Sequence, residues 1–275
     1  MLNIIYSCND KIFDGLYLSI LSILRRTKSE IHFHVLTGNL TNLNPDYTAL
    51  SLDHQSKLDA MIKSFNKNNE FSVIDCTKKY QDYFGKEYDV FRFTPYAIFR
   101  LFIPSFSCFK GANLYLDVDT LANGDISKAF NVDISKVEMC VCHDYLITLH
   151  EKNPNSISFN SGVLLINVDM VRQTKYFDKA LELYKKTNPD MADQVVLNEC
   201  WTKIMTWKNE YRFNYQRNGI ESDTIIKHFN YTGMHVSDIF NVKPWDMHKV
   251  HNILNLHNWD EDYKYFAEQK KQWKD

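Results

Sequence analysis

Short β-rich apolar runs alternate along most of the chain with longer stretches whose apolar residues recur every three or four positions. The short runs predict strands and the longer stretches predict amphipathic helices. Strands are predicted at 2–8, 31–37, 71–75, 113–119, 138–144 and 159–168, and helices at 13–26, 48–65, 96–104, 170–186 and 192–201. The last three strands are apolar almost throughout, as is typical of central strands buried on both faces. This order predicts an α/β fold with a mostly parallel central sheet and helices on both faces.

The regular pattern fades after about residue 200, where aromatic residues and histidines accumulate. The last segment, 259–275, mixes aromatic residues with lysines and acidic residues and is typical of a charged helix. We predict one domain at 1–250 and a helical tail at 251–275, which either packs on the domain or makes peripheral contact with a membrane. The histidines at 248, 251 and 257 have no cysteine nearby, which favours a solvated surface over a zinc site.

Composition narrows the class of protein. With 275 residues, 44% of them hydrophobic, the chain can bury a sizeable core. A formal net charge of -2 gives no overall electrostatic reason to bind nucleic acid, so we expect no such partner. The opening MLNIIYSCND lacks the basic start and the long apolar core of a signal peptide. We therefore expect a cytoplasmic protein, with peripheral attachment at the inner face of the membrane as the alternative.

Glycine is scarce, and the scarcity excludes one kind of site. The eight glycines are spread along the chain, and no two lie close together in sequence. Phosphate loops such as GxGxxG need closely spaced glycines, because backbone amides must approach the phosphate. If the protein binds a nucleotide, another group must neutralise the phosphates.

Two carboxylates stand at the end of an apolar strand in the stretch ANLYLDVDTLANGDI. Asp117 and Asp119 share one side of the strand, with Val118 on the opposite side, so their charges repel. A divalent cation between them would cancel the repulsion, because hard cations prefer oxygen ligands. A lone DxD also fits a turn cap beside a solvated carboxylate, so the neighbouring motifs must decide.

Further polar residues lie directly after other predicted strands or at the starts of predicted helices. Ligands of open α/β sheets bind outside the carboxyl ends of the strands, where several of these groups fall. Amide side chains can bind hydroxyl groups, and a small residue lets a ligand approach the backbone. The candidates are Cys8, Asn9, Asp10, His143, Asp144, Asn160, Ser161, Gly162, Asp193, Gln194, His228, Gly233, Lys243 and Trp245. Together they would form a polar pocket with a metal, a cation for phosphate and groups that bind hydroxyls.

Seven motifs in a fixed order resemble a known family. They are YSCND, YAIFRL, LYLDVDTL, FNSGVLLIN, ADQVVLN, HFNYTG and KPW, and they span about residues 2–246. In this set the chain resembles glycosyltransferase family 8, the glycogenin-like and bacterial lipooligosaccharide galactosyltransferase-like enzymes. The resemblance implies a GT-A fold and transfer of a hexose with retention of anomeric configuration. It also implies Mn2+ as cofactor, with Mg2+ as the alternative, a UDP-hexose donor with glucose or galactose, and a saccharide or glycoconjugate acceptor.

The same resemblance implies roles for single residues. Asp117 and Asp119 of the DXD motif, with His228, would hold the metal that bridges the diphosphate, and Lys243 would pair with phosphate. The donor would be bound by Cys8, Asn9, Asp10, Arg100, Asp117, Val118, Asn160, Ser161, Gly233 and Lys243, with the first three at the uridine. The catalytic residues would be Asp144, Asp193 and Gln194. A metal and a lysine would thus take the place of the missing phosphate loop.

The chain departs from the family at the C-terminal motif. Nine residues, MHVSDIFNV, separate Gly233 from Lys243, so His235 is an alternative to His228 as the third metal ligand. Two other functions stay open. A haloacid-dehalogenase-type phosphatase also has a DxD after an apolar strand, but it needs Thr or Val where Leu121 stands. A catalytically inactive sugar-nucleotide-binding protein would keep the pocket without the reaction.

Overall fold

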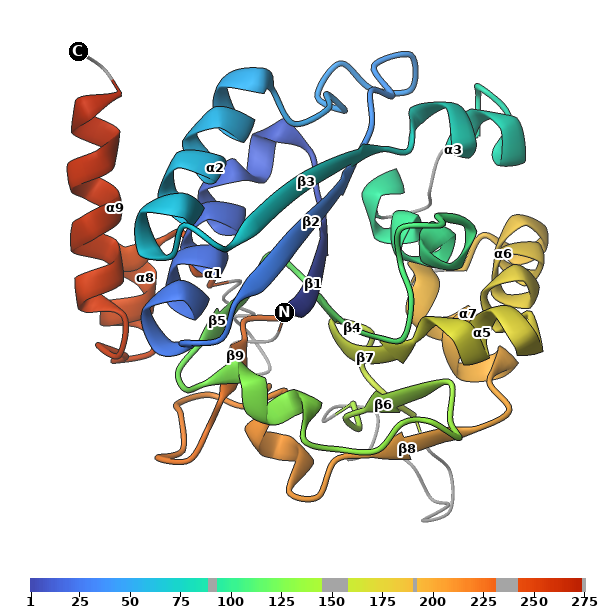
Figure 1. The fold of residues 1–275 in the computed structure, drawn as a ribbon. Coiled ribbons are helices and arrows are strands. Elements are labelled where there is room, and N and C mark those ends of the chain that lie inside the picture. The colour runs from blue at the N-terminus through green and yellow to red at the C-terminus, as the bar shows by residue number, and fades with distance from the viewer. Residues whose placement is uncertain (89–92, 145–157, 190–191, 231–241, 274–275) are drawn as a thin grey trace.

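The computed structural model describes residues 1–88, 93–144, 158–189, 192–230 and 242–273. Its central strands are β1 (Leu2–Ser7), β2 (Ile31–Thr37), β3 (Glu70–Asp75), β4 (Ala112–Leu116), β6 (Met139–Val141), β7 (Val163–Asn167) and β8 (Ile204–Thr206). They form a seven-stranded sheet in the order β3-β2-β1-β4-β7-β6-β8 (Figure 1). β1 pairs in parallel with β2 and β4, β2 with β3, and β6 with β8, whereas β7 runs antiparallel to both neighbours. The predicted mostly parallel sheet is confirmed.

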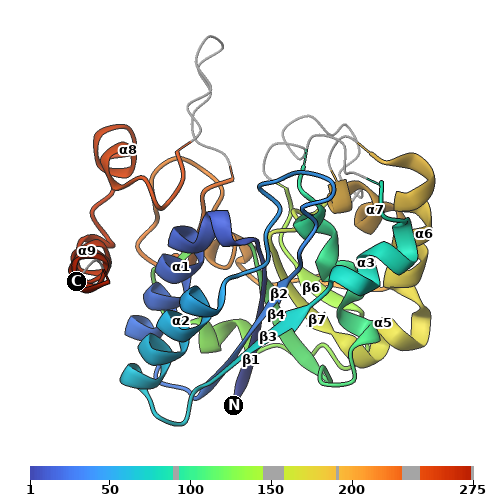
Figure 2. The same cartoon turned by 90° about the horizontal axis from the view of Figure 1, so that it is seen from above.

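Helices cover both faces of this sheet (Figures 1 and 2). One face carries α1 (Phe13–Arg26) and α2 (Leu52–Phe65), and the other carries α3 (Thr77–Phe84), the 3-10 helix η2 (Pro95–Ser105), α5 (Val168–Thr174), α6 (Tyr176–Thr187) and α7 (Ala192–Cys200). Alternate side chains of β1 enter different cores: Ile4 and Tyr6 pack with α1, and Ile5 packs with η2. Short 3-10 helices occur at η1 (Asp10–Ile12), η3 (Ile126–Phe130) and η4 (Glu210–Arg212).

A small second sheet joins distant parts of the chain. β5 (Thr120–Ala122) pairs antiparallel with β9 (Ile226–His228), and Thr120 lies opposite His228. Because β5 starts directly after Asp119, this register places the His228 backbone beside the DXD motif. The pattern did not predict β5, β8 or β9, since each is only three residues long and has no measurable period.

The helix predicted at 170–186 is wrong as a single element, because the structure divides it into α5 and α6. Lys175 between them has φ 55, in the left-handed region, and its N–H bonds Arg172 O at 3.2 Å. A left-handed residue ends a helix by turning the chain back onto the last carbonyls. The apolar pattern continues across this break, so periodicity alone does not reveal it. The predicted helix at 96–104 is the 3-10 helix η2.

The C-terminal segment packs on α1. It contains α8 (Met247–Asn252) and α9 (Asp260–Gln272). The buried Asp262 carboxylate forms ion pairs with Arg26 at 2.8 Å and Arg25 at 3.4 Å, and Trp259 donates its indole N–H to Ala122 O at 2.7 Å. Among the described residues, no helix has both the length and the apolar character needed to cross a bilayer. Contact of the tail with a membrane surface stays a prediction.

Candidate active site

A cavity of about 620 Å³ opens beside Ser7, the last residue of β1, and Asp117, which follows β4. This is the carboxyl edge of the parallel strands, where open α/β sheets bind ligands. Most of the predicted site residues line it: Arg100, Asp117, Val118, Asp119, Asp144, Asn160, Ser161, Asp193, Gln194, His228 and Lys243. Gly233 and the alternative metal ligand His235 lie outside the described residues. The fold thus collects side chains from widely separated segments in one cavity of ligand size.

Asp117, Asp119 and His228 form a cluster suited to a metal ion. One ligand atom of each lies within 4.8 Å of those of the other two. His228 Nε2 is 3.2 Å from Asp119 Oδ1 and 3.9 Å from Asp117 Oδ2. Two carboxylates favour a hard divalent cation, and an imidazole nitrogen can complete the ligand set. The donor set therefore fits the Mn2+, or alternatively Mg2+, that the resemblance implied.

Gly162 makes room for this cluster. A Cβ at this position would stand 2.2 Å from Cε1 of His228 and 2.8 Å from Oδ2 of Asp117. The carbonyl of Gly162 also accepts the N–H of Asp117 at 2.8 Å. The side chains of His228 and Asp117 therefore occupy the space that a side chain at position 162 would need.

Asn214 orients the imidazole of His228 and was not found from the sequence. Its Oδ1 lies 3.1 Å from His228 Nδ1, and its Nδ2 donates to Asn160 Oδ1 at 3.1 Å. A proton on Nδ1, donated to Asn214, leaves Nε2 to face the two carboxylates as a metal ligand would. Asn214 is almost fully buried and lies in an irregular segment, where neither periodicity nor a motif marks it.

Lys243 lies against the same cluster. Its Nζ is 2.5 Å from Asp119 Oδ2 and donates to Phe229 O at 3.2 Å. Burial by itself raises the pKa of Asp119, but the neighbouring His228 and Lys243 lower that pKa below its usual value. Asp119 is therefore held as a carboxylate with a cation close by, which is the state that a metal ligand requires.

Arg100 is a buried cation between two carboxylates. It donates from Nη2 to Asp117 Oδ1 at 2.9 Å, and its Nε lies 3.1 Å from Asp193 Oδ2. Its guanidinium lies 4.2 Å from the centre of the Tyr115 ring, and the Tyr115 hydroxyl donates to Asp117 Oδ1 at 3.1 Å. Burial raises the pKa of Asp193 to about 6, although Arg100 acts in the opposite direction. Arg100 therefore fixes Asp117 within the Asp117–Asp119–His228 cluster and links it to Asp193.

Gln194, Asn160 and Asp144 form a connected hydrogen-bond network that lines the same cavity as the cluster. Gln194 Oε1 accepts from Asn160 Nδ2 and from the Ser161 N–H, both at 3.2 Å. Gln194 Nε2 donates to Asp144 Oδ2 at 3.0 Å, and Asn160 Nδ2 reaches the same oxygen at 3.4 Å. Both ends of the Gln194 amide are thus fixed, in a cavity wall rich in groups that can exchange hydrogen bonds with hydroxyls.

The three residues predicted at the uridine are not among those that line the cavity. The Cys8 side chain is fully buried, and Asn9 donates to Asp46 O at 3.2 Å. Asp10 accepts from the Ser51 N–H at 2.8 Å and lies 2.6 Å from His54 Nδ1. From this part of the chain, Ser7 at the end of β1 and Ile12 of η1 line the cavity instead. Contact of Cys8, Asn9 and Asp10 with uridine stays a prediction.

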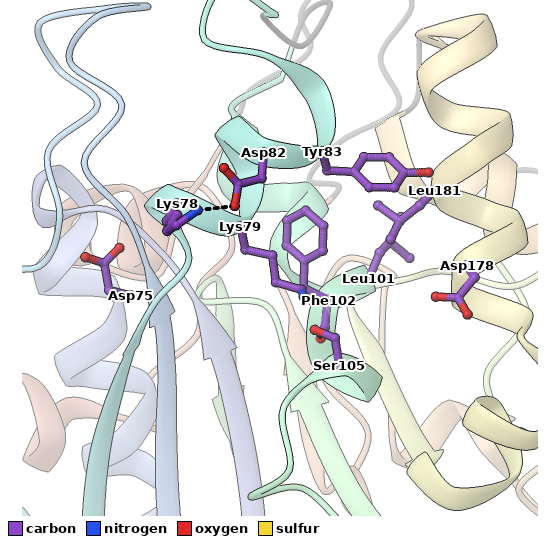
Figure 3. Close-up of a pocket in the computed structure, with 10 residues that line it drawn as sticks. All are labelled: Asp75, Lys78, Lys79, Asp82, Tyr83, Leu101, Phe102, Ser105, Asp178 and Leu181. Carbon is purple, nitrogen blue, oxygen red and sulfur yellow. Dashed lines mark hydrogen bonds and ion pairs between the residues drawn. The ribbon is translucent and has the colours of Figure 1, made fainter.

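A second cavity, of about 490 Å³, lies between α3, η2 and α6 (Figure 3). Its lysines already have partners: Lys78 pairs with Asp82, and Lys79 Nζ lies 5.9 Å from the centre of the Phe102 ring. The residues of the Asp117–Asp119–His228 cluster do not line it. The cavity that holds this cluster is therefore the better candidate for an active site.

Solved structures with a similar fold are glycosyltransferases. An active-site mutant of LgtC matches with a TM-score of 0.71 over 97% of this chain and 96% of that chain, at 17% identity. GlyE of Streptococcus pneumoniae TIGR4 matches with a TM-score of 0.60 over 98% of this chain and 65% of that chain, also at 17% identity. The chain therefore has the GT-A fold that the resemblance implied.

Comparison with protein families assigns the chain to one of them. Residues 3–249 match glycosyl transferase family 8, and the chain belongs to this family. Membership of this family sets the phosphatase alternative aside.

Curated relatives agree with this membership. A putative glycosyltransferase of Haemophilus influenzae is 27% identical over 77% of this chain and 63% of its own length. Glycosyltransferase GlyB of Streptococcus pneumoniae is 29% identical over 55% of this chain and 38% of its own length. This chain spans less than two thirds of the length of these relatives.

Proposed function

We propose that the protein transfers a hexose, glucose or galactose, from a UDP-sugar to a saccharide or glycoconjugate acceptor, with retention of anomeric configuration. The proposal rests on the convergence in one cavity of the Asp117–Asp119–His228 cluster, Lys243 and the amides of Asn160 and Gln194. A metal ion in the cluster and the Lys243 ammonium would suit a diphosphate, and the two amides suit sugar hydroxyls. A solved structure of galactosyltransferase LgtC contains donor and acceptor sugar analogs, which supports a sugar donor and a saccharide acceptor here as well.

The diphosphate would bind beside the metal cluster. Asp117, Asp119 and His228 would hold Mn2+, with Mg2+ as the alternative, and the bound ion would stabilise the charge that develops on the leaving diphosphate. Lys243 lies at the same carboxylate and has a flexible side chain, so it would turn to donate to the phosphate oxygens. The protein then needs no glycine-rich loop for phosphate.

The hexose would lie against the wall formed by Asp144, Asn160, Asp193 and Gln194. These side chains are almost completely buried, so each hydrogen bond that they lose to one another must be replaced by a bond to the sugar. Arg100 would keep Asp193 in place through its ion pair. A sugar with a hydroxyl in the wrong orientation would leave one of these groups unpaired, which is how the wall would select the hexose.

The position of Gln194 favours a same-face displacement over a double displacement. An amide is a poor nucleophile, and both ends of this one are already hydrogen-bonded. The bond from the anomeric carbon to the diphosphate would break while the acceptor oxygen bonds to the same face. The acceptor proton would pass to the leaving phosphate oxygen. Gln194 would orient the acceptor and stabilise the oxocarbenium-like centre.

The test uses the full chain with Mn2+ and a panel of UDP-sugars, with and without saccharide acceptors, and measures UDP release and UDP binding. We expect Mn2+-dependent UDP binding and release with UDP-glucose or UDP-galactose. Asp119→Asn should lose both, and Asp53→Asn, on the exposed surface of α2, should keep both. Binding without release would favour the inactive sugar-nucleotide-binding alternative, and neither binding nor release would overturn the proposal. The anomeric configuration of the product, read by NMR, checks retention separately.

A further inference from the structure

A second cluster of side chains with metal-ligand chemistry joins α8 to α9. His251 lies on α8, His257 lies in the connection, and Asp260 is the first residue of α9. One ligand atom of each lies within 4.8 Å of those of the other two. His251 Nε2 is 2.8 Å from Asp260 Oδ1, and His257 Nδ1 is 3.2 Å from Asp260 Oδ2. This cluster shares no residue with the candidate active site.

The backbone of the connection builds this arrangement. Asn255 has φ 51, in the left-handed region, and the chain turns back there so that the His257 ring stacks on the His251 ring, with ring centres 4.5 Å apart. The N–H of Asp260 donates to His257 O at 3.3 Å. Each imidazole therefore directs one nitrogen toward the Asp260 carboxylate. No sequence motif indicates this arrangement.

We propose that His251, His257 and Asp260 form a second metal site that binds Zn2+, in place of the solvated surface that the sequence favoured for these two histidines. Imidazole nitrogen is a preferred ligand of Zn2+, and sites with three protein ligands leave a position for water. The two-imidazole set differs from the two-carboxylate set of the active-site cluster, which favours a harder cation. The side chains are 24%, 56% and 50% exposed, respectively, so an ion can enter from solvent without rearrangement of the core.

The site would hold the joint between the two C-terminal helices. The His251 ring packs edge-on against Tyr263 of α9, with ring centres 5.9 Å apart. The Tyr263 hydroxyl donates to Pro244 O at 2.7 Å, and Pro244 directly follows Lys243 of the active-site cavity. A zinc ion at the joint would therefore stabilise the segment that carries Lys243, without contacting the active site itself.

The test uses the untagged full chain in an Asp117→Asn/Asp119→Asn background, so that the active-site cluster does not contribute. The protein is stripped with a chelator and titrated with Zn2+ by calorimetry and with Co2+ by visible absorption. We expect one bound equivalent of Zn2+, d–d bands with Co2+ and a rise of the melting temperature with Zn2+. His257→Ala should weaken Zn2+ binding about tenfold or more and remove the Co2+ bands.

His248→Ala is the matched control. His248 lies on α8 near His251 but bonds Asn252 instead of Asp260, so its loss should leave Zn2+ binding unchanged. The His257 ring is mostly exposed, and circular dichroism verifies that His257→Ala stays folded. Unchanged Zn2+ affinity in His257→Ala, or no Zn2+ bound by the background protein, would overturn the proposal. Equal losses in His257→Ala and His248→Ala would do the same, because they would indicate a site of different composition.

Discussion

Lys243 Nζ lies 2.5 Å from Oδ2 of Asp119, so an ammonium already pairs with one of the two carboxylates proposed to hold the metal. An ammonium and a divalent cation both approach carboxylate oxygens and repel each other. Metal binding should therefore loosen Lys243 from Asp119 and leave its ammonium free to meet the phosphates. In the proposed function, Lys243 would thus couple metal binding to donor binding.

Replacing Lys243 by Met should separate the two events. Mn2+ binding without UDP should be unchanged or tighter, because the competing ammonium is gone, whereas UDP-sugar turnover should fall by about 100-fold or more. Calorimetry with Mn2+ and a UDP-release assay measure the two effects. Lys249→Met removes a lysine of α8 whose partner is Asp246 and should change neither. Loss of Mn2+ affinity together with turnover would contradict the competition.

Gly162→Ala should disrupt the metal cluster more than the fold. The new Cβ would meet His228 Cε1 at 2.2 Å, and His228 would have to move away from the carboxylates. We expect a destabilisation of about 1–3 kcal/mol and a strong loss of Mn2+ affinity. At Gly124 a Cβ would meet nothing nearer than 3.5 Å, so Gly124→Ala is the control. Equal Mn2+ affinity in both variants would show that His228 is not a ligand.

Asn214→Ala tests whether the orientation of His228 matters. Without the Asn214 oxygen, the imidazole loses the partner that fixes its ring and tautomer. Mn2+ affinity should fall about 10–100-fold, as for other groups that support metal-bound histidines. Asn258→Ala changes an exposed asparagine and should leave the affinity intact. An unaffected Asn214→Ala would remove this residue from the site.

Asp193 should give the stability of the metal-free protein a measurable pH dependence. Its folded pKa, about 6, is above the ordinary value of 3.8, so the folded state binds the proton more tightly than the unfolded state does. The carboxyl therefore stabilises the fold most below pH 3.8, and up to about 3 kcal/mol of that contribution is lost as pH rises to about 6.

Asp193→Asn mimics the protonated form and should remove this loss. The measurement is the free energy of unfolding of the wild type and Asp193→Asn at several pH values. The difference between the two proteins should grow in favour of the variant as pH rises through this range. A constant difference would mean that the Arg100 ion pair keeps Asp193 ionised throughout.

The sequence predicted the fold and most of the cavity lining because those signals are local. Alternation and apolar runs mark the strands, and the carboxyl ends of β4 and β6 place Asp117 and Asp144 at one edge of the sheet. Asn160 lies at the same edge because it precedes β7, which runs antiparallel to β4 and β6. Two features of the fold could not be predicted because they depend on backbone conformation or tertiary pairing. Lys175 interrupts a continuous helical pattern through its backbone conformation, and β5 and β9 exist only because they pair with each other.

In the proposed metal site, too, some residues could be predicted from local sequence signals and others depend on tertiary contacts. Resemblance to the family indicated His228, but periodicity could not place it, since β9 is too short to have a period. Asn214 gave no signal at all, because an asparagine in an irregular segment has no pattern until the fold brings it to the imidazole. The predicted uridine contacts at Cys8, Asn9 and Asp10 need a bound donor to test them.

The pairing of Thr120 with His228 also has a consequence for how the chain folds. The two residues are more than a hundred positions apart, so the pairing closes a long loop, whose entropy is lost before any contact within it is gained. We expect the small sheet to form late, after the central sheet has assembled. Mn2+ binding would then report the last stage of refolding, and a stopped-flow signal from bound Mn2+ should lag behind the recovery of secondary structure.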